Sequence, residues 1–168
     1  EYRRQRQMCI RDRVNTHGTD PTNPDSDGDG LSDSEELNVH GTDPNDTDSD
    51  ADGLNDYNEI NTHGTDPIDS DSDDDGLNDG DEVNEYGTEP TIKDSDGDGL
   101  VDGAEISTYN SDPTSTDSDD DGINDGSEVL NYGTEPDNND TDGDNVNDGS
   151  EINNYGTDPV SYTHLRAH

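Results

Sequence analysis

An acidic twelve-residue segment recurs every 23 residues along this chain, and this period constrains the fold more than any other feature. No residue is inserted or deleted between copies. The copies begin at Asp25, Asp48, Asp71, Asp94, Asp117 and Asp140. A fixed short period is typical of repeat architectures, in which each unit packs on its neighbours. We therefore predict six complete repeats over residues 25–159, preceded by the end of a truncated repeat at 14–24.

The residue types in each copy match a loop that wraps around a calcium ion. In the copy at 94–105, carboxylates stand at positions 1, 3, 5, 9 and 12 and glycine at position 6, which is the ligand spacing of a calcium loop. With the backbone carbonyl of position 7 and two oxygens from the glutamate, the loop offers about seven oxygens, which suits Ca²⁺ better than Mg²⁺. The predicted metal ligands are Asp25, Asp27, Asp29, Leu31, Asp33 and Glu36; Asp48, Asp50, Asp52, Leu54, Asp56 and Glu59; Asp71, Asp73, Asp75, Leu77, Asp79 and Glu82; Asp94, Asp96, Asp98, Leu100, Asp102 and Glu105; Asp117, Asp119, Asp121, Ile123, Asp125 and Glu128; and Asp140, Asp142, Asp144, Val146, Asp148 and Glu151. We expect about one ion per repeat, with a second ion as an open alternative.

Composition limits what else can hold such a chain together. It has 47 acidic and 7 basic residues, a formal net charge of -40 and only 20% hydrophobic residues, which is typical of disordered chains. The single cysteine, Cys9, has no internal partner for a disulfide, so bound cations must stabilise the repeats. The charge argues against nucleic acid and anionic membranes as direct partners, and no apolar run is long enough to span a membrane.

The two ends of the chain differ from the array. Residues 1–13 and 160–168 hold every basic residue except Lys93, and their sequences look like translated sequencing-adapter read-through. We interpret both segments as non-native, with a basic binding arm as the alternative. Because the chain begins with Glu1, the lack of a signal peptide is uninformative, and we expect native sequence to continue beyond both ends.

Between the loops, each repeat is expected to form a short helix and a turn. In the first repeat, Ser32 can cap a helix that runs to about His40, and Gly41 ends it. Asn110 replaces glycine at one helix end and tolerates the same left-handed conformation. A proline three residues later, such as Pro44, prevents a restart of the helix. These features predict small irregular metal-stabilised repeats in an extended linear array of calcium loops and short helices, with little or no β-sheet.

Little apolar surface is available for packing. Besides loop position 7, one helix position and the helix end carry apolar or aromatic residues. The helix positions are Leu37, Ile60, Val83, Ile106, Val129 and Ile152, and the helix ends are His40, His63, Tyr86, Tyr109, Tyr132 and Tyr155. We interpret His17, His40 and His63 as packing residues rather than ligands, because tyrosine fills their slot in later repeats. This stripe is too small to offset the entropy of ordering a repeat, so calcium must supply most of the difference.

Several other classes of protein are disfavoured. No nucleophile, base and orienting group recur together, and no apolar pocket is available to raise a carboxyl pKa, so we do not expect an enzyme. The apolar loop residue lies at position 7 rather than at position 8 as in paired EF-hands, so calcium-sensor pairs are not expected. Asn145 replaces glycine at position 6 of the last loop, which is therefore expected to bind more weakly.

Residues 14–159 as a whole resemble the bacterial form of the thrombospondin type 3 repeat. The resemblance rests on the loop at 94–105 and on the Tyr-Gly-Thr-Asp-Pro turn at 155–159. It implies extracellular calcium-binding repeats, commonly strung between other domains of secreted or cell-surface proteins. The array lacks the cysteines of the animal repeats, so their disulfide-linked wrapping is not expected.

The resulting expectation is a monomeric, calcium-stabilised rigid spacer or stalk of a bacterial surface protein. Its partners would be calcium ions and the flanking domains of a larger protein. A dockerin-like or adhesive protein-interaction module and an extracellular calcium reservoir are the alternatives. An interaction module needs a distinctive exposed apolar surface, which six nearly equal repeats do not show. A reservoir needs only charge, and predicts ion binding with little structural change.

Overall fold

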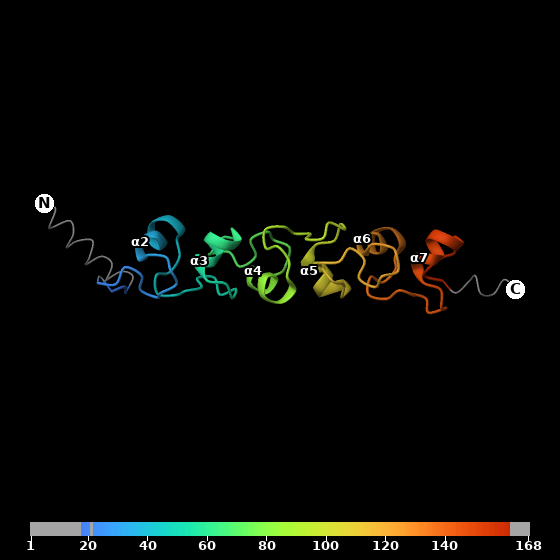
Figure 1. Cartoon of the computed structure of the whole chain (residues 1–168), viewed down its shortest axis with the longest axis horizontal. Helices are drawn as coiled ribbons and strands as arrows, with labels where there is room; N and C mark the ends of the chain where they lie inside the picture. The colour runs from blue at the N-terminus through green and yellow to red at the C-terminus, as the bar shows by residue number, and fades with distance from the viewer. Residues whose placement is uncertain (1–17, 21, 162–168) are drawn as a thin grey trace. The chain divides into compact units, whose positions relative to one another are not determined.

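The computed structural model describes residues 18–20 and 22–161 (Figure 1). It consists of short helical segments, each preceded by an acidic loop, and no strand occurs in this part of the chain. Each segment begins as a turn of α-helix and continues as a π-helical turn. The segments are α2 Asp33–Glu35 with η2 Glu36–His40, α3 Asp56–Asn58 with η3 Glu59–His63, α4 Asp79–Asp81 with η4 Glu82–Tyr86, α5 Asp102–Ala104 with η5 Glu105–Tyr109, α6 Asp125–Ser127 with η6 Glu128–Tyr132, and α7 Asp148–Ser150 with η7 Glu151–Tyr155. The predicted combination of acidic loops and short helices without a β-sheet is confirmed for the described residues.

Some of the predictions concern residues outside this description. Residues 1–13, and 160–168 apart from Val160 and Ser161, are not among the described residues. Cys9 and His17 lie outside them as well. The interpretation of both ends as non-native therefore stays a prediction.

Helices α2, α3, α6 and α7 begin at loop position 9, where the side chain at position 8 caps them, whereas Val101 before α5 makes no side-chain cap. Ser32 Oγ accepts the backbone N–H of Glu35 at 3.3 Å, and the Glu35 carboxylate accepts the N–H of Ser32 at 3.1 Å, which completes a capping box. Asn55, Asn124 and Asn147 occupy the same position before α3, α6 and α7, and each accepts the N–H three residues later. The predicted cap at Ser32 is confirmed.

Each helix ends as predicted, but its second half is wider than an α-helix. The backbone N–H of Gly41 donates to the carbonyl of Glu36, five residues earlier, at 2.7 Å. Gly41 has φ 86° and Asn110 has φ 59°, so both helix ends are left-handed. The acceptor of the closing bond belongs to the position-12 glutamate, and the helix end is therefore tied directly to the acidic loop.

The interior of the repeats is more acidic than apolar. At loop position 7, Leu31, Leu54, Leu100 and Ile123 are 6% exposed. The glutamates at position 12 are 0% exposed in every loop, namely Glu36, Glu59, Glu82, Glu105, Glu128 and Glu151. Buried carboxylates cost free energy unless hydrogen bonds or cations compensate for lost water. Calcium stabilisation, inferred from the sparse apolar residues, is therefore also supported by what the chain buries.

Residues around the helix end are only partly covered. The helix positions such as Leu37 and Ile60 are half-buried, as are His40 and His63. The equivalent tyrosine is 67% exposed at Tyr155. The proline after each helix end lies deeper, and Pro44 is fully buried. Prolines thus contribute to the interior as well as blocking helix restart.

The chain divides into two compact units, one of residues 1–72 and 78–81 and the other of residues 73–77 and 82–168. The boundary falls within the third loop. In the described part of the chain, no helix has the length and apolar character needed to cross a membrane. The extended linear arrangement of the repeats stays a prediction.

Candidate metal centres

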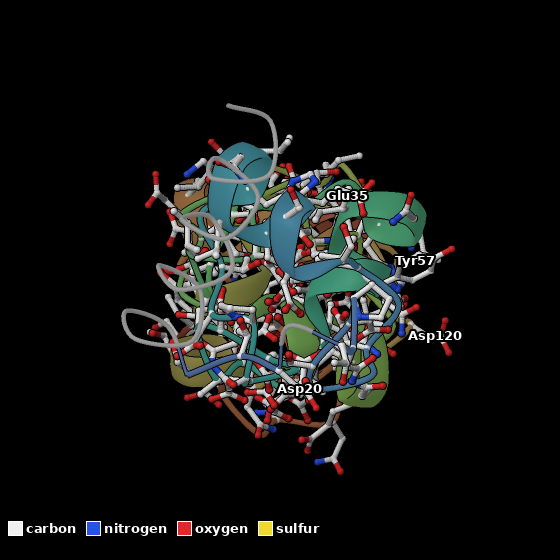
Figure 2. All side chains as sticks on the ribbon, turned by 90° about the vertical axis from the view of Figure 1, so that its left-hand side faces the viewer. Asp20, Glu35, Tyr57 and Asp120 are labelled. Atoms are coloured by element: carbon white, nitrogen blue, oxygen red, sulfur yellow. The ribbon has the colours of Figure 1, made fainter. Side chains whose placement is uncertain are left out.

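Carboxylates at positions 1, 3 and 5 converge within a loop. In loop 1, one oxygen each from Asp25, Asp27 and Asp29 lie within 4.8 Å of one another. Loops 2 and 4 repeat this arrangement with Asp48, Asp50 and Asp52 and with Asp94, Asp96 and Asp98. Asp120, at position 4 of loop 5, is exposed and points away from the ribbon in Figure 2. The loop therefore places three of its predicted ligands around one point.

Backbone N–H groups fix the orientation of these carboxylates. In loop 4, Asp96 Oδ1 accepts the N–H of Asp98 at 3.0 Å, and Asp98 Oδ1 accepts the N–H of Leu100 at 2.8 Å. The second oxygen of the position-3 aspartate is left buried without a hydrogen-bond partner. This holds for Oδ2 of Asp27, Asp50, Asp96 and Asp119. Burial, followed by the charge of neighbouring Asp52, raises the pKa of Asp50 to about 6.

Position 12 contributes the most deeply buried carboxylate. Glu105 Oε1 accepts a hydrogen bond from Ser111 Oγ at 3.1 Å, whereas its Oε2 is buried without a partner. Burial raises the pKa of Glu105 to about 8, with further contributions from Asp96 and Asp98. Burial likewise raises the pKa of Glu59 to about 8. Such groups favour protonation or a bound cation over an isolated negative charge.

The hydroxyl that holds this glutamate was not assigned a role from the sequence. Thr65 and Thr88 occupy the place of Ser111 in their repeats, and their hydroxyls donate to Glu59 at 3.3 Å and to Glu82 at 3.1 Å. All three hydroxyl residues are buried. The signal was visible, because a threonine or serine follows each glycine or asparagine at the helix end. From the sequence alone, this residue indicates only a turn.

The aspartate at position 9 contacts both its own loop and the preceding repeat. Asp79 Oδ1 accepts the N–H of Ser72 at 2.8 Å, and Oδ2 accepts the Ser72 hydroxyl at 2.6 Å. A carboxylate oxygen of Asp79 also lies within 4.8 Å of oxygens from Asp52 and Glu59, which belong to the preceding repeat. The structure therefore brings position 9 next to the loop before it. Its role as a ligand of its own loop stays a prediction, as does that of the position-7 carbonyl.

Glycine at position 10 allows consecutive repeats to approach. The N–H of Gly80 donates to Asp52 Oδ2 at 2.9 Å, and the N–H of Gly103 donates to Asp75 Oδ2 at 3.0 Å. A Cβ on Gly80 would lie 2.1 Å from the carbonyl oxygen of Asp52, which no real side chain tolerates. Gly126 and Gly149 make the same contact with the preceding loop. The sequence pattern does not reveal this role, because the partner lies 28 residues away.

The donor set fits calcium. The loops combine several carboxylates whose inward oxygens are buried and lack partners, and a hard cation prefers such oxygen ligands. Carboxylates at positions 1, 3, 5 and 12 would hold the ion, while the N–H groups of the loop keep them in place. No cysteine lies among the described residues, so they offer no thiolate ligand for a soft metal ion.

These features define a protein built from calcium-binding repeats. The family model of the bacterial TSP3 repeat matches residues 25–47, 48–70, 71–91, 94–116 and 140–161, which is more than half of the chain. The chain belongs to this family, as its sequence predicted. Arrays of TSP3 repeats are non-enzymatic calcium-binding structures, so calcium binding and the absence of an enzymatic role are both confirmed by this membership.

Comparisons with whole proteins give short matches only. None of the curated proteins matches the chain. A solved structure described as the B domain of a biofilm associated protein is 44% identical over 27% of this chain and 11% of its own, with a TM-score of 0.27. A second, described as the BSP domain of a biofilm associated protein, is 49% identical over 26% of this chain and 7% of its own, with a TM-score of 0.25. The chain thus spans a small fraction of either solved protein.

Proposed function

We propose that the repeats form a rigid spacer in a larger secreted or cell-surface bacterial protein, and that bound calcium makes the spacer stiff. The observation that carries the proposal is the burial of carboxylates in place of a hydrophobic core. Glu59 and Glu105 are 0% exposed, and each has an oxygen without a partner. A chain with this interior is ordered only when cations neutralise it, so its stiffness follows the calcium concentration.

The contacts between repeats support a mechanical role. The position-10 N–H of one repeat holds the position-5 aspartate of the repeat before it, as in the pair Gly103 and Asp75. Asp75 is also a predicted ligand of its own loop. An ion that orders the loop therefore also orders the surface on which the next repeat docks. Repeats coupled to their nearest neighbours in this way stiffen together along an array.

The proposed location follows from the chemistry of the sites. Calcium loops of extracellular modules bind with dissociation constants of about 10⁻⁴ to 10⁻³ M, and extra carboxylates tighten binding. Sites in this range stay filled outside the cell, where calcium is plentiful. Flanking domains would then carry adhesion or catalysis, while the repeats set their distance from the surface.

Small-angle scattering combined with circular dichroism tests the proposal. The chain would be stripped of metal with a chelator and titrated with calcium, and separately with magnesium. The expected result is a calcium-specific change from a broad coil to a defined rod with helical signal, which saturates near six ions or near twelve if each repeat takes two. A matched control replaces the position-12 glutamate of every loop by glutamine. Scattering that stays coil-like while ions bind would reject the spacer and favour a reservoir.

A further inference from the structure

The junction between repeats 1 and 2 departs from the later junctions. Position 10 of repeat 2 is Tyr57, where repeats 3 to 6 have glycine. The ring of Tyr57 lies over Gly30 of loop 1, because a Cβ on Gly30 would be 3.1 Å from Tyr57 Cδ2. Tyr57 is 41% exposed and projects at the edge of the molecule in Figure 2. A side chain at this position thus covers the preceding loop instead of leaving room for a backbone contact.

Asp29 lacks a hydrogen bond that the position-5 aspartates of loops 2 to 5 accept. Its Oδ1 accepts the N–H of Leu31 at 2.7 Å, as in the other loops. Its Oδ2 is buried and has no hydrogen-bond partner. The equivalent oxygen of Asp52 accepts the N–H of Gly80. At the glycine junctions even a Cβ would lie between 2.1 and 2.4 Å from the carbonyl oxygen of the preceding aspartate, so only glycine allows this bond.

Other oxygens of loop 1 are also unsatisfied. Glu36 is 0% exposed, and both of its carboxylate oxygens lack a partner. In loops 2, 3 and 4, by contrast, one oxygen of the equivalent glutamate accepts a hydroxyl. Glu128 of loop 5 lacks partners on both oxygens as Glu36 does, so the unpartnered oxygen of Asp29 is what separates loop 1 from loop 5. Buried oxygens without donors raise the free energy of the ion-free loop, and a cation that they ligate removes this cost. Loop 1 therefore gains more than loop 2 from the same ion.

We propose that Tyr57 tunes the first calcium site. By keeping the position-10 N–H away from Asp29, it leaves one more carboxylate oxygen for the ion, and loop 1 fills at lower free calcium than loops 2 to 5. The inference rests on calcium binding by the loops and does not depend on the spacer role.

Site-resolved nuclear magnetic resonance of the ¹⁵N-labelled full chain tests this proposal. Loop position 6 is glycine in the loops compared, and its amide reports occupancy during a titration with buffered calcium. The probes are Gly30, Gly53, Gly76, Gly99 and Gly122. The Gly30 resonance is expected to reach its midpoint at about tenfold lower free calcium than the others, which corresponds to one unsatisfied buried group.

Two substitutions of Tyr57 separate the backbone contact from the ring. Tyr57→Gly removes the Cβ, allows the N–H to reach Asp29, and is expected to bring the Gly30 midpoint into the range of the other loops. Tyr57→Ala removes the ring but keeps the Cβ, so Gly30 should still respond first. The reciprocal change, Gly126→Tyr, places a Cβ against the carbonyl oxygen of Asp98, so this junction has to open as the junction at Tyr57 does. It should thereby release Asp98 and shift the Gly99 midpoint to lower calcium.

Two outcomes would contradict the role of Tyr57. Equal midpoints in the unaltered chain, or equal behaviour of the alanine and glycine variants, would overturn the proposal. If Tyr57→Gly does not fold in calcium, Gly126→Tyr still decides, since an unchanged Gly99 midpoint would reject the mechanism. A titration in which no glycine amide responds would instead contradict calcium binding itself.

Discussion

Ser118 Oγ donates a hydrogen bond to Asp125 Oδ2 at 2.6 Å and accepts the backbone N–H of Asp112 at 2.7 Å. One hydroxyl thus joins the turn that ends repeat 4 to a buried carboxylate of repeat 5. Ser49 and Ser72 make the same pair of bonds in repeats 2 and 3. The serine between two predicted calcium ligands is therefore part of the connection between repeats.

Removing this hydroxyl should weaken the fold. Ser118→Ala leaves Asp125 short of a donor, and we expect the free energy of unfolding in calcium to fall by about 1–3 kcal/mol. Urea denaturation followed by circular dichroism measures the change. Ser118→Thr is the matched control, because Thr141 takes the place of the serine in repeat 6 and accepts the N–H of Glu135 at 3.0 Å. A destabilised threonine variant, or an alanine variant as stable as the original, would contradict this prediction.

Substituting a position-12 glutamate should have opposite effects with and without calcium. Glu105→Gln removes a predicted bidentate ligand, so calorimetric titration should detect one ion fewer. Without calcium, the same change removes the cost of protonating or burying a carboxylate, and the variant should keep more helical signal in chelator than the original chain. Glu85→Gln makes the same chemical change at an exposed position. It should alter neither quantity, and a loss of one ion there would undermine the assignment of position 12.

Stability should depend on pH in opposite directions with and without calcium. The pKa of Glu36 is raised from 4.5 to about 7, and those of Glu59 and Glu128 to about 8, chiefly by burial. A carboxyl with a raised folded pKa stabilises the fold below its unfolded pKa, and this contribution is lost as the pH rises through the folded value. The folded form of the calcium-free chain should therefore be disfavoured as the pH rises from about 4.5 to about 8, and the chelated chain should gain helical structure as the pH is lowered through this range.

Calcium reverses this dependence because ions and protons compete for the same oxygens. In saturating calcium, stability should fall as the pH is lowered through the same range. The helical circular dichroism signal of the chain in chelator, and denaturation in calcium, at several pH values measure both slopes. Parallel slopes in the two conditions would show that these glutamates do not bind the ion.

Backbone strain offers a route to a more stable chain. Ala51, at position 4 of loop 2, has φ 65°, whereas Gly28, Gly97 and Gly143 hold this position in loops 1, 4 and 6. Ala51→Gly should stabilise the calcium-loaded chain by about 1 kcal/mol, since the left-handed region penalises a Cβ. Thermal denaturation in calcium checks the change.

The reverse substitution is the control. Gly97 has φ 81°, and a Cβ there would meet no atom within 4 Å, so Gly97→Ala introduces strain without a clash. It should destabilise the chain by about 1 kcal/mol. Equal stability of both variants and the original chain would mean that position 4 relaxes freely.

Local features of the fold could be predicted from the sequence because local residues cause them. The period defined the repeats, and the cap at Ser32 follows from a side chain that bonds an N–H group three residues away. The left-handed end at Asn110 was predicted for the same reason. The π-helical turn was not, since it depends on the acceptor that the helix-end N–H selects, the carbonyl of Glu105 rather than one nearer in sequence.

Relationships between repeats could not be predicted in this way. Gly80 and Gly103 look unfavourable inside a helix when only propensity is considered. Their reason is a carbonyl oxygen of the preceding repeat, at Asp52 and Asp75, which would clash with any Cβ. The placement of Asp79 beside Asp52 and Glu59 depends on the same approach. Spacing within one loop predicts ligands, but it does not reveal which neighbouring loop a carboxylate also faces.

The acidic interior has a consequence for temperature. Unfolding an ordinary domain exposes hydrocarbon, which raises the heat capacity and bends the stability curve into a dome, whereas exposure of polar groups lowers the heat capacity. Here unfolding exposes groups such as Glu59 and Glu105 and few large aliphatic side chains. We therefore expect a small heat-capacity change on unfolding of the calcium-loaded chain. Its free energy of unfolding should change almost linearly with temperature, without a loss of stability on cooling.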